Sequence, residues 1–199
     1  LGRSDVAGAL RALTLGSNTI REGGLTALVK GGGLRRLERL VLGGYGSNHN
    51  DVRAADVAAL AASPVAAGLT DFDLSGNVYL GSAGARVLAE VASLGRLERL
   101  GLARCNIHTD GAVALAASPH LRSLRSLDLM NNGITSAVGH ALASGTWMAT
   151  LVRLYLARNA IGKATAHFLA CPRLGEEGNR VPPDVRQKLK DKLGDRVRF

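Results

Sequence analysis

The side chains of this sequence that could do chemistry are its histidines, cysteines and acidic residues, which act in other proteins as metal ligands, nucleophiles and acid–base groups. The two cysteines, Cys105 and Cys171, lie 66 residues apart, and that spacing fits no metal-binding motif. No serine or cysteine can be combined with a histidine and an acid into a catalytic set, and no pocket can be argued around Asp71 and Asp73. We therefore predict a protein that is not an enzyme and that binds no metal and no cofactor.

Two further features could hold a ligand, but neither has the pattern of a known site. His140 and His167 lie 27 residues apart, at the same position of the repeat described below, and no third ligand converges on them. The glycine-rich stretch 43–49 has neither the Gly-Lys-Ser/Thr ending of a phosphate-binding loop nor a Gly-x-Gly-x-x-Gly entry to a helix. The chemistry left to this sequence is that of a binding surface.

A repeated pattern supplies the elements that must position such a surface. Six segments read Leu-x-x-Leu-x-Leu-x-x-Asn/Cys-x-apolar, with Phe72 at one leucine position and a glycine-rich insertion before Asn50 in the second segment. Their starts at 10, 37, 69, 97, 124 and 151 are 27, 32, 28, 27 and 27 residues apart. Alternating leucines place apolar side chains on one face of a short strand, and the small, helix-forming residues that follow can pack behind it. Since one such unit cannot bury its apolar face alone, stacked neighbours must bury it for one another.

This pattern resembles the leucine-rich repeat family over residues 10–174, and its helical second half is similar to the ribonuclease-inhibitor type of repeat. The resemblance implies an α/β solenoid, shaped as a horseshoe arc, in a single domain over 1–199. It implies about six parallel strands on the concave side, a further C-terminal cap strand, and helices on the convex side. The linkers typified by 114–121, together with the C-terminal tail, are similar to leucine-rich repeat proteins of planctomycete bacteria.

The two ends of the chain depart from the repeat. At the C-terminus, residues 180–199 carry seven basic and three acidic side chains, and Pro182-Pro183 followed by an apolar stripe predicts a helix and a last strand that cap the solenoid. At the N-terminus, no cap is recognisable in residues 1–9, and the planctomycete relatives often carry a helical domain ahead of the repeats. We therefore expect the core beside the first strand to be open, or covered by a domain of the same polypeptide that precedes this chain.

An asparagine or cysteine follows each predicted strand in a tight turn. Its side chain can bond to the backbone of adjacent coils, and we predict this structural ladder at Asn18, Asn50, Asn77, Cys105, Asn132 and Asn159. Cysteine takes this position in ribonuclease-inhibitor repeats, so the resemblance implies that Cys105 is a structural thiol. The pattern ends with an apolar residue two places later, which in the third repeat is Tyr79, and one extra residue follows Asn77 in that repeat.

The residues between the strand leucines are predicted to line the concave sheet. Neighbouring strands lie about 4.8 Å apart, so Arg39, Asp71 and Arg99 would form a row of alternating charge. Such a row could simply satisfy itself, or it could recognise a protein through arginine and tyrosine anchors. Tyr45, in the glycine-rich insertion, could anchor a partner or fold back over its strand. The predicted partner-binding residues are Arg39, Tyr45, Asp71, Asp73, Arg99, Arg104, Asp128, Met130, Arg153, Tyr155 and Arg158.

These features predict a protein–protein interaction scaffold that binds a partner on its concave face. Nucleic-acid binding is an alternative because the net charge is +9 and the sequence pI is about 10.4, although aromatic residues make up only 4% of the chain. Regulation of a GTPase is a further alternative, implied only by the family resemblance. Because the sequence contains no recognisable signal peptide and no apolar run long enough to cross a bilayer, we expect a cytoplasmic protein with reduced cysteines.

Overall fold

The computed structural model describes residues 5–44, 50–145, 147 and 150–161, and it contains six strands and five α-helices over these ranges. The strands are β1 (Ala12–Thr14), β2 (Arg39–Val41), β3 (Asp71–Asp73), β4 (Arg99–Gly101), β5 (Ser126–Asp128) and β6 (Arg153–Tyr155). The helices are α1 (Gly24–Lys30), α2 (Ala54–Ala61), α3 (Gly81–Glu90), α4 (His108–Ala116) and α5 (Val138–Ser144). Three short 3-10 helices are η1 (Asp5–Ala9), η2 (Ala66–Gly68) and η3 (Ala92–Leu94).

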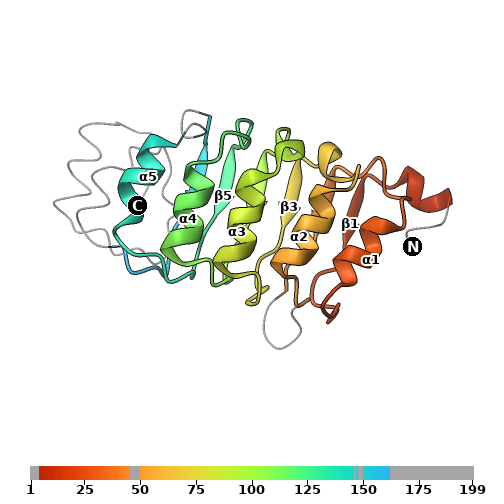
Figure 1. Cartoon of the computed structure of the whole chain (residues 1–199), viewed down its shortest axis with the longest axis horizontal. Helices are drawn as coiled ribbons and strands as arrows, with labels where there is room; N and C mark the ends of the chain where they lie inside the picture. The colour runs from red at the N-terminus through yellow and green to blue at the C-terminus, as the bar shows by residue number, and fades with distance from the viewer. Residues whose placement is uncertain (1–4, 45–49, 146, 148–149, 162–199) are drawn as a thin grey trace.

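The six strands form one parallel sheet in chain order, and each strand pairs with the next without any shift in register. Figure 1 shows α1 to α5 side by side in one layer, with the strands in a second layer behind them. The central residue of each strand points toward the helices, and Leu40, Phe72 and Leu127 are completely buried there. The α/β leucine-rich repeat solenoid expected from the leucine spacing is therefore confirmed.

The two layers differ in the spacing that they require. Neighbouring strands lie about 4.8 Å apart, whereas the axes of packed helices lie about 8–10 Å apart. A stack of strand–helix units must therefore curve with its sheet on the inner side. We call the side of the sheet that points away from the helices the sheet face.

The first coil is less well covered than the coils that follow it. Leu10, Leu13 and Leu15 are only partly buried, whereas the corresponding leucines of the second coil are at most 1% exposed. The 3-10 helix η1 precedes this coil and buries Ala7 in the core. Among the described residues the first coil is therefore the less buried one, and whether a preceding domain covers it stays a prediction. The cap predicted for 180–199 lies outside the described residues.

Tyr79, which the spacing assigns to the last apolar position of the motif, does not lie in the core. Its side chain is 55% exposed, and Leu80, at 1%, takes the buried position instead. The cause is the extra residue after Asn77, which moves the apolar position one place along the chain. A Cβ atom on Gly84 would lie 2.3 Å from Cδ1 of Leu80, just as one on Gly24 would lie 1.9 Å from Cγ2 of Ile20. The glycine four places after the buried side chain thus makes room for it.

The segment between α5 and β6 contributes a core residue that the repeat pattern did not predict. Trp147 is completely buried, and its indole Nε1 donates a hydrogen bond to the carbonyl oxygen of Leu115 at 2.8 Å. A buried indole needs such a partner because its N–H would otherwise lose its hydrogen bond to water. Trp147 therefore links the last described coil to α4.

Candidate functional site on the sheet face

Two rows of side chains cross the sheet face, one from the first and one from the third residue of every strand. The first row is Ala12, Arg39, Asp71, Arg99, Ser126 and Arg153. The second row is Thr14, Val41, Asp73, Gly101, Asp128 and Tyr155. The structure thus brings seven of the predicted partner-binding residues together on three-residue strands, because the shared register aligns equivalent positions.

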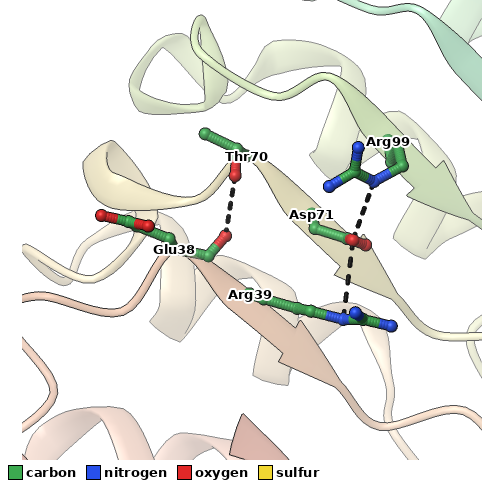
Figure 2. Close-up of polar contacts among 5 residues, drawn as sticks. All are labelled: Glu38, Arg39, Thr70, Asp71 and Arg99. Carbon is green, nitrogen blue, oxygen red and sulfur yellow. Dashed lines mark hydrogen bonds and ion pairs between the residues drawn. The ribbon is translucent and has the colours of Figure 1, made fainter. Parts of the chain in front are cut away.

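At the centre of the first row, Asp71 lies between two arginines (Figure 2). Its Oδ2 accepts a hydrogen bond from Nε of Arg99 at 2.8 Å and lies 3.6 Å from Nε of Arg39. The Asp71 side chain is only 13% exposed, whereas those of Arg39 and Arg99 are 58% and 54% exposed. One sunken carboxylate therefore orients two exposed guanidinium groups, and the three residues together carry one net positive charge.

The backbone at the start of β3 fixes the height of this carboxylate. The carbonyl oxygen of Glu38 accepts hydrogen bonds from the N–H groups of Thr70, at 2.8 Å, and Asp71, at 3.1 Å. The Thr70 hydroxyl donates a third hydrogen bond to the same oxygen at 3.2 Å, as Figure 2 shows. These contacts join β2 to β3 directly beside the charge row.

The second row is acidic at its centre. Asp73 and Asp128 are half-buried on either side of Gly101, and each carboxylate accepts a hydrogen bond from the backbone two residues on, at 2.8 Å from Ser75 and 2.9 Å from Met130. A Cβ on Gly101 would lie 2.4 Å from Oδ1 of Asp73, so the absence of a side chain there is what admits this carboxylate. Burial raises the pKa of Asp128, and the negative charge of Asp73 raises it further.

Asp128→Asn is expected to increase the melting temperature at neutral pH. The folded protein, in which the pKa is raised, binds the proton of Asp128 more tightly than the unfolded chain does. The contribution of Asp128 to the free energy of unfolding therefore falls as the pH rises from 3.8, the ordinary pKa of an aspartate, through the raised pKa of the folded protein. Asparagine keeps an acceptor for Met130 without the charge.

Thermal melts of both proteins from pH 4 to pH 8 test this prediction. The difference in melting temperature should be smallest at pH 4 and should grow as the pH rises. Asp110→Asn is the matched control, because the side chain of Asp110 is 75% exposed on α4 and should give a nearly pH-independent difference. A lower melting temperature for Asp128→Asn than for the natural protein at pH 8 would contradict the prediction.

The remaining predicted residues lie where the strands end. Arg104 and Arg158 are exposed at equivalent turn positions and share a left-handed backbone, with φ of 55° and 59°. Met130 is half-buried, as is Tyr155 of the second row. Tyr45 lies outside the described residues, so both interpretations of its role stay predictions.

Tyr79 was not identified from the sequence as an exposed surface residue. Tyr79 stacks under the guanidinium of Arg53, whose Cζ lies 5.1 Å from the ring centroid. Arg53 also forms an ion pair with Glu22 at 3.4 Å. The extra residue after Asn77 was the sequence signal that could have placed Tyr79 outside the core.

Beneath these turns, the asparagine side chains connect successive coils. In Asn132, Oδ1 accepts hydrogen bonds from the N–H groups of Cys105, at 2.9 Å, and Ile107, at 3.3 Å, while Nδ2 donates to the carbonyl oxygen of Leu102 at 2.7 Å. Asn50 and Asn159 each accept two hydrogen bonds and donate one to the preceding coil in the same way. These contacts hold the turns, and with them the sheet face, in register.

Cys105 takes the same position, but its sulfur is only a weak hydrogen-bond acceptor. Its Sγ lies 3.2 Å from the carbonyl oxygen of Leu74, and burial raises its pKa to about 12, so it is a neutral thiol at physiological pH. The third coil does not need an acceptor here, since the N–H groups of Asn77 and Leu80 already donate to carbonyl oxygens of their own coil. The extra residue in that coil therefore explains why cysteine suffices.

Other kinds of site find no support in the part of the chain that the structure describes. No group of three histidine, cysteine or acidic side chains could hold a metal ion among the described residues. The side chain of His140 and the whole of His167 lie outside them, as does Cys171. None of the described helices is long and apolar enough to span a bilayer.

Comparisons with known proteins agree with this architecture. The profile of the family described as Leucine Rich repeat matches residues 69–89, 97–116 and 120–143. A search of curated proteins found no significant match. Among solved structures, a chain in the crystal structure of the Rad7 and Elc1 complex in yeast is similar, with a TM-score of 0.58 and 16% sequence identity. The similarity covers 90% of this chain and 52% of that one, so this chain spans about half of its length.

The fold and the repeat matches together define the class. The protein is a parallel α/β solenoid built from strand–turn–helix coils. More narrowly, it is a leucine-rich repeat solenoid, with the family match confined to the third, fourth and fifth coils.

Proposed function

We propose that this protein is a non-enzymatic scaffold that binds a protein partner on its sheet face, which is the concave side of the arc. The observation that carries the proposal is the row Arg39–Asp71–Arg99, where a sunken acid orients two arginines that are more than half exposed. Arginines fixed in this way lose little conformational entropy on binding, and arginine is among the residues that most often dominate protein interfaces. The similar yeast chain comes from a complex of two proteins, which also supports the proposal.

A finer classification follows from the length of the coils. Four of the five described helices have seven to nine residues and one has ten, which agrees with the helical second half of ribonuclease-inhibitor repeats. We propose that the chain is of this type and that its relatives are the planctomycete bacterial proteins. A cytoplasmic location and a domain preceding Leu1 stay predictions.

A photo-crosslinking experiment tests the proposed function. A benzophenone amino acid placed at Ser126 lies on the sheet face between Arg99 and Arg153, whereas the same residue at Val113 lies on the exposed side of α4. In cells that naturally produce the protein, we expect a discrete protein adduct from position 126 and none from position 113.

The controls separate the alternatives. Adducts from position 113 alone would reject the sheet face as the binding surface, and so would the absence of any adduct from position 126. Adducts that nuclease removes and protease does not would favour the nucleic-acid alternative. An adduct from position 126 that Arg99→Glu abolishes would support the role of the charge row.

A further inference from the structure

Arginine recurs in the first row at every second strand. Arg39 lies on β2, Arg99 on β4 and Arg153 on β6, and all three are exposed. With strands about 4.8 Å apart, alternate strands place these backbones about 10 Å apart along the sheet. The row therefore presents three cationic groups at a regular interval.

The two arginines beside Asp71 are oriented before any partner arrives. Both contact its carboxylate through Nε, and a guanidinium carries five N–H donors in a fixed plane. Four donors on each arginine are therefore outside this contact, in a geometry suited to a second carboxylate. Because one carboxylate offsets only one of the two charges, the pair still attracts an anion.

The charge of the sheet face changes sign along the strands. The loops just before the strands carry the exposed side chains of Arg36, Arg96 and Arg125, together with the partly buried Glu38 and Glu98. Toward the strand ends, Asp73 and Asp128 flank Gly101 and would repel a carboxylate. An acidic partner is thus directed to the first row, in a line that crosses the strands.

A nucleic acid fits this pattern less well than an acidic protein segment does. Duplex DNA carries one charge per about 1.7 Å of axis, so its phosphates cannot be confined to one narrow row. Phosphates beyond the row would meet Asp73 and Asp128, and among the described residues Tyr155 is the single aromatic side chain in the two rows. A protein segment can place carboxylates only where the arginines are.

From this spacing, we infer that the partner presents an extended segment in the polyproline II conformation, with acidic side chains at every third residue aligned with Arg39, Arg99 and Arg153. A segment in the polyproline II conformation has three residues per turn and rises about 3.1 Å per residue, so the side chains of residues i, i+3 and i+6 share one face and repeat at about 9 Å, close to the interval between alternate strands. This inference rests on the proposed function and adds the chemistry and spacing of the partner.

Two peptides of equal composition and charge test the inference. One is capped (Gly-Glu-Ser) repeated three times, and the other is capped Gly-Ser-Gly-Glu-Glu-Glu-Ser-Gly-Ser. Titrations into the 15N-labelled full chain, followed by amide chemical shifts, measure weak binding and locate it at once. We expect the spaced peptide to bind about fivefold to tenfold more tightly than the clustered one, with shifts along the first row.

Matched variants show whether the arginines are responsible. Arg153→Gln should weaken binding of the spaced peptide about threefold, and Arg39→Gln with Arg99→Gln about tenfold. Arg86→Gln, on α3 and 56% exposed, removes the same charge from the helix layer and should change the affinity little. The dispersion of the amide peaks shows whether each variant is folded. Within the described residues, Arg153 forms no ion pair with a buried acid, so its replacement leaves no buried carboxylate unpaired.

The outcomes separate this inference from the proposed function. Equal binding of the two peptides, or no loss with Arg153→Gln and the double variant, would overturn the inference, whereas the crosslink at position 126 would still stand. A 20-base-pair DNA duplex that binds along the first row more tightly than the spaced peptide would overturn it in favour of nucleic acid.

Discussion

Leu127→Ala is expected to lower the free energy of unfolding by about 2–5 kcal/mol. Leu127 is completely buried at the centre of β5, where its register partners are Leu100 of β4 and Leu154 of β6. The truncated side chain loses its van der Waals contacts with the leucines on both neighbouring strands. A cavity remains in their place, because the backbone hydrogen bonds of the three strands prevent the core from collapsing into it. The loss should therefore be felt by the coils before and after it.

Neighbouring side chains that point the other way provide the controls. Ser126→Ala, one residue earlier on the sheet face, should change the stability by less than about 0.5 kcal/mol, and Arg99→Ala should also have little effect because Arg39 still contacts Asp71. Urea unfolding can be followed by circular dichroism and by the fluorescence of Trp147, the single tryptophan of the chain. Larger losses from Ser126→Ala or Arg99→Ala than from Leu127→Ala would contradict the assignment of inward and outward positions.

The register of this sheet could be predicted from the sequence because the spacing of the leucines leaves little choice. A strand shifted by one residue would turn Leu127 to water and bury Asp128 in its place, at a cost of several kcal/mol. The same spacing places Arg39, Asp71 and Arg99 side by side. The row of alternating charge therefore follows from the sequence.

How this row is arranged depends on depth, which the sequence pattern does not encode. In the sequence pattern, Asp71, Asp73 and Asp128 are all polar residues beside strand leucines, and the pattern does not distinguish their depth or charge environment. In the structure, Asp71 lies low between two arginines, whereas burial and the charge of Asp73 raise the pKa of Asp128. The difference comes from the neighbouring strands, where arginine flanks one acid and side-chain-free Gly101 separates the other two.

The misplacement of Tyr79 has a different origin. Its position was assigned by counting from Asn77, although glycine at position 84 shows that the count must restart one residue later. A buried side chain there needs a small residue four places on, and Gly84 provides that space for Leu80. A rule based on the packing of the coil, and not on its distance from the asparagine, would have placed Tyr79 on the surface.

Asn132→Ala is expected to cost about 3–5 kcal/mol, as much as the loss of a core leucine. The side chain is 1% exposed, and its removal leaves the N–H groups of Cys105 and Ile107 and the carbonyl oxygen of Leu102 without their partner in the core. Each buried polar group left unsatisfied costs about 1–3 kcal/mol, although some relaxation toward water reduces the sum. Urea unfolding gives the total, and faster hydrogen exchange at the amide of Ile107 would locate it.

A cysteine at position 132 tests whether this position requires a hydrogen-bond acceptor or simply tolerates either asparagine or cysteine. Asn132→Cys supplies a donor for Leu102 but no good acceptor, so it should cost nearly as much as alanine, even though cysteine occupies the equivalent position 105. At position 105 the demand is absent, because the extra residue lets Asn77 and Leu80 donate within their own coil, and Cys105→Ala should therefore cost less than Asn132→Ala. Equal losses from these two alanine variants would show that the side chains contribute by filling space and not by accepting hydrogen bonds from the preceding coil. In that case the coils would be held in register by their leucines alone, and the alignment of the two rows on the sheet face would need no ladder beneath it.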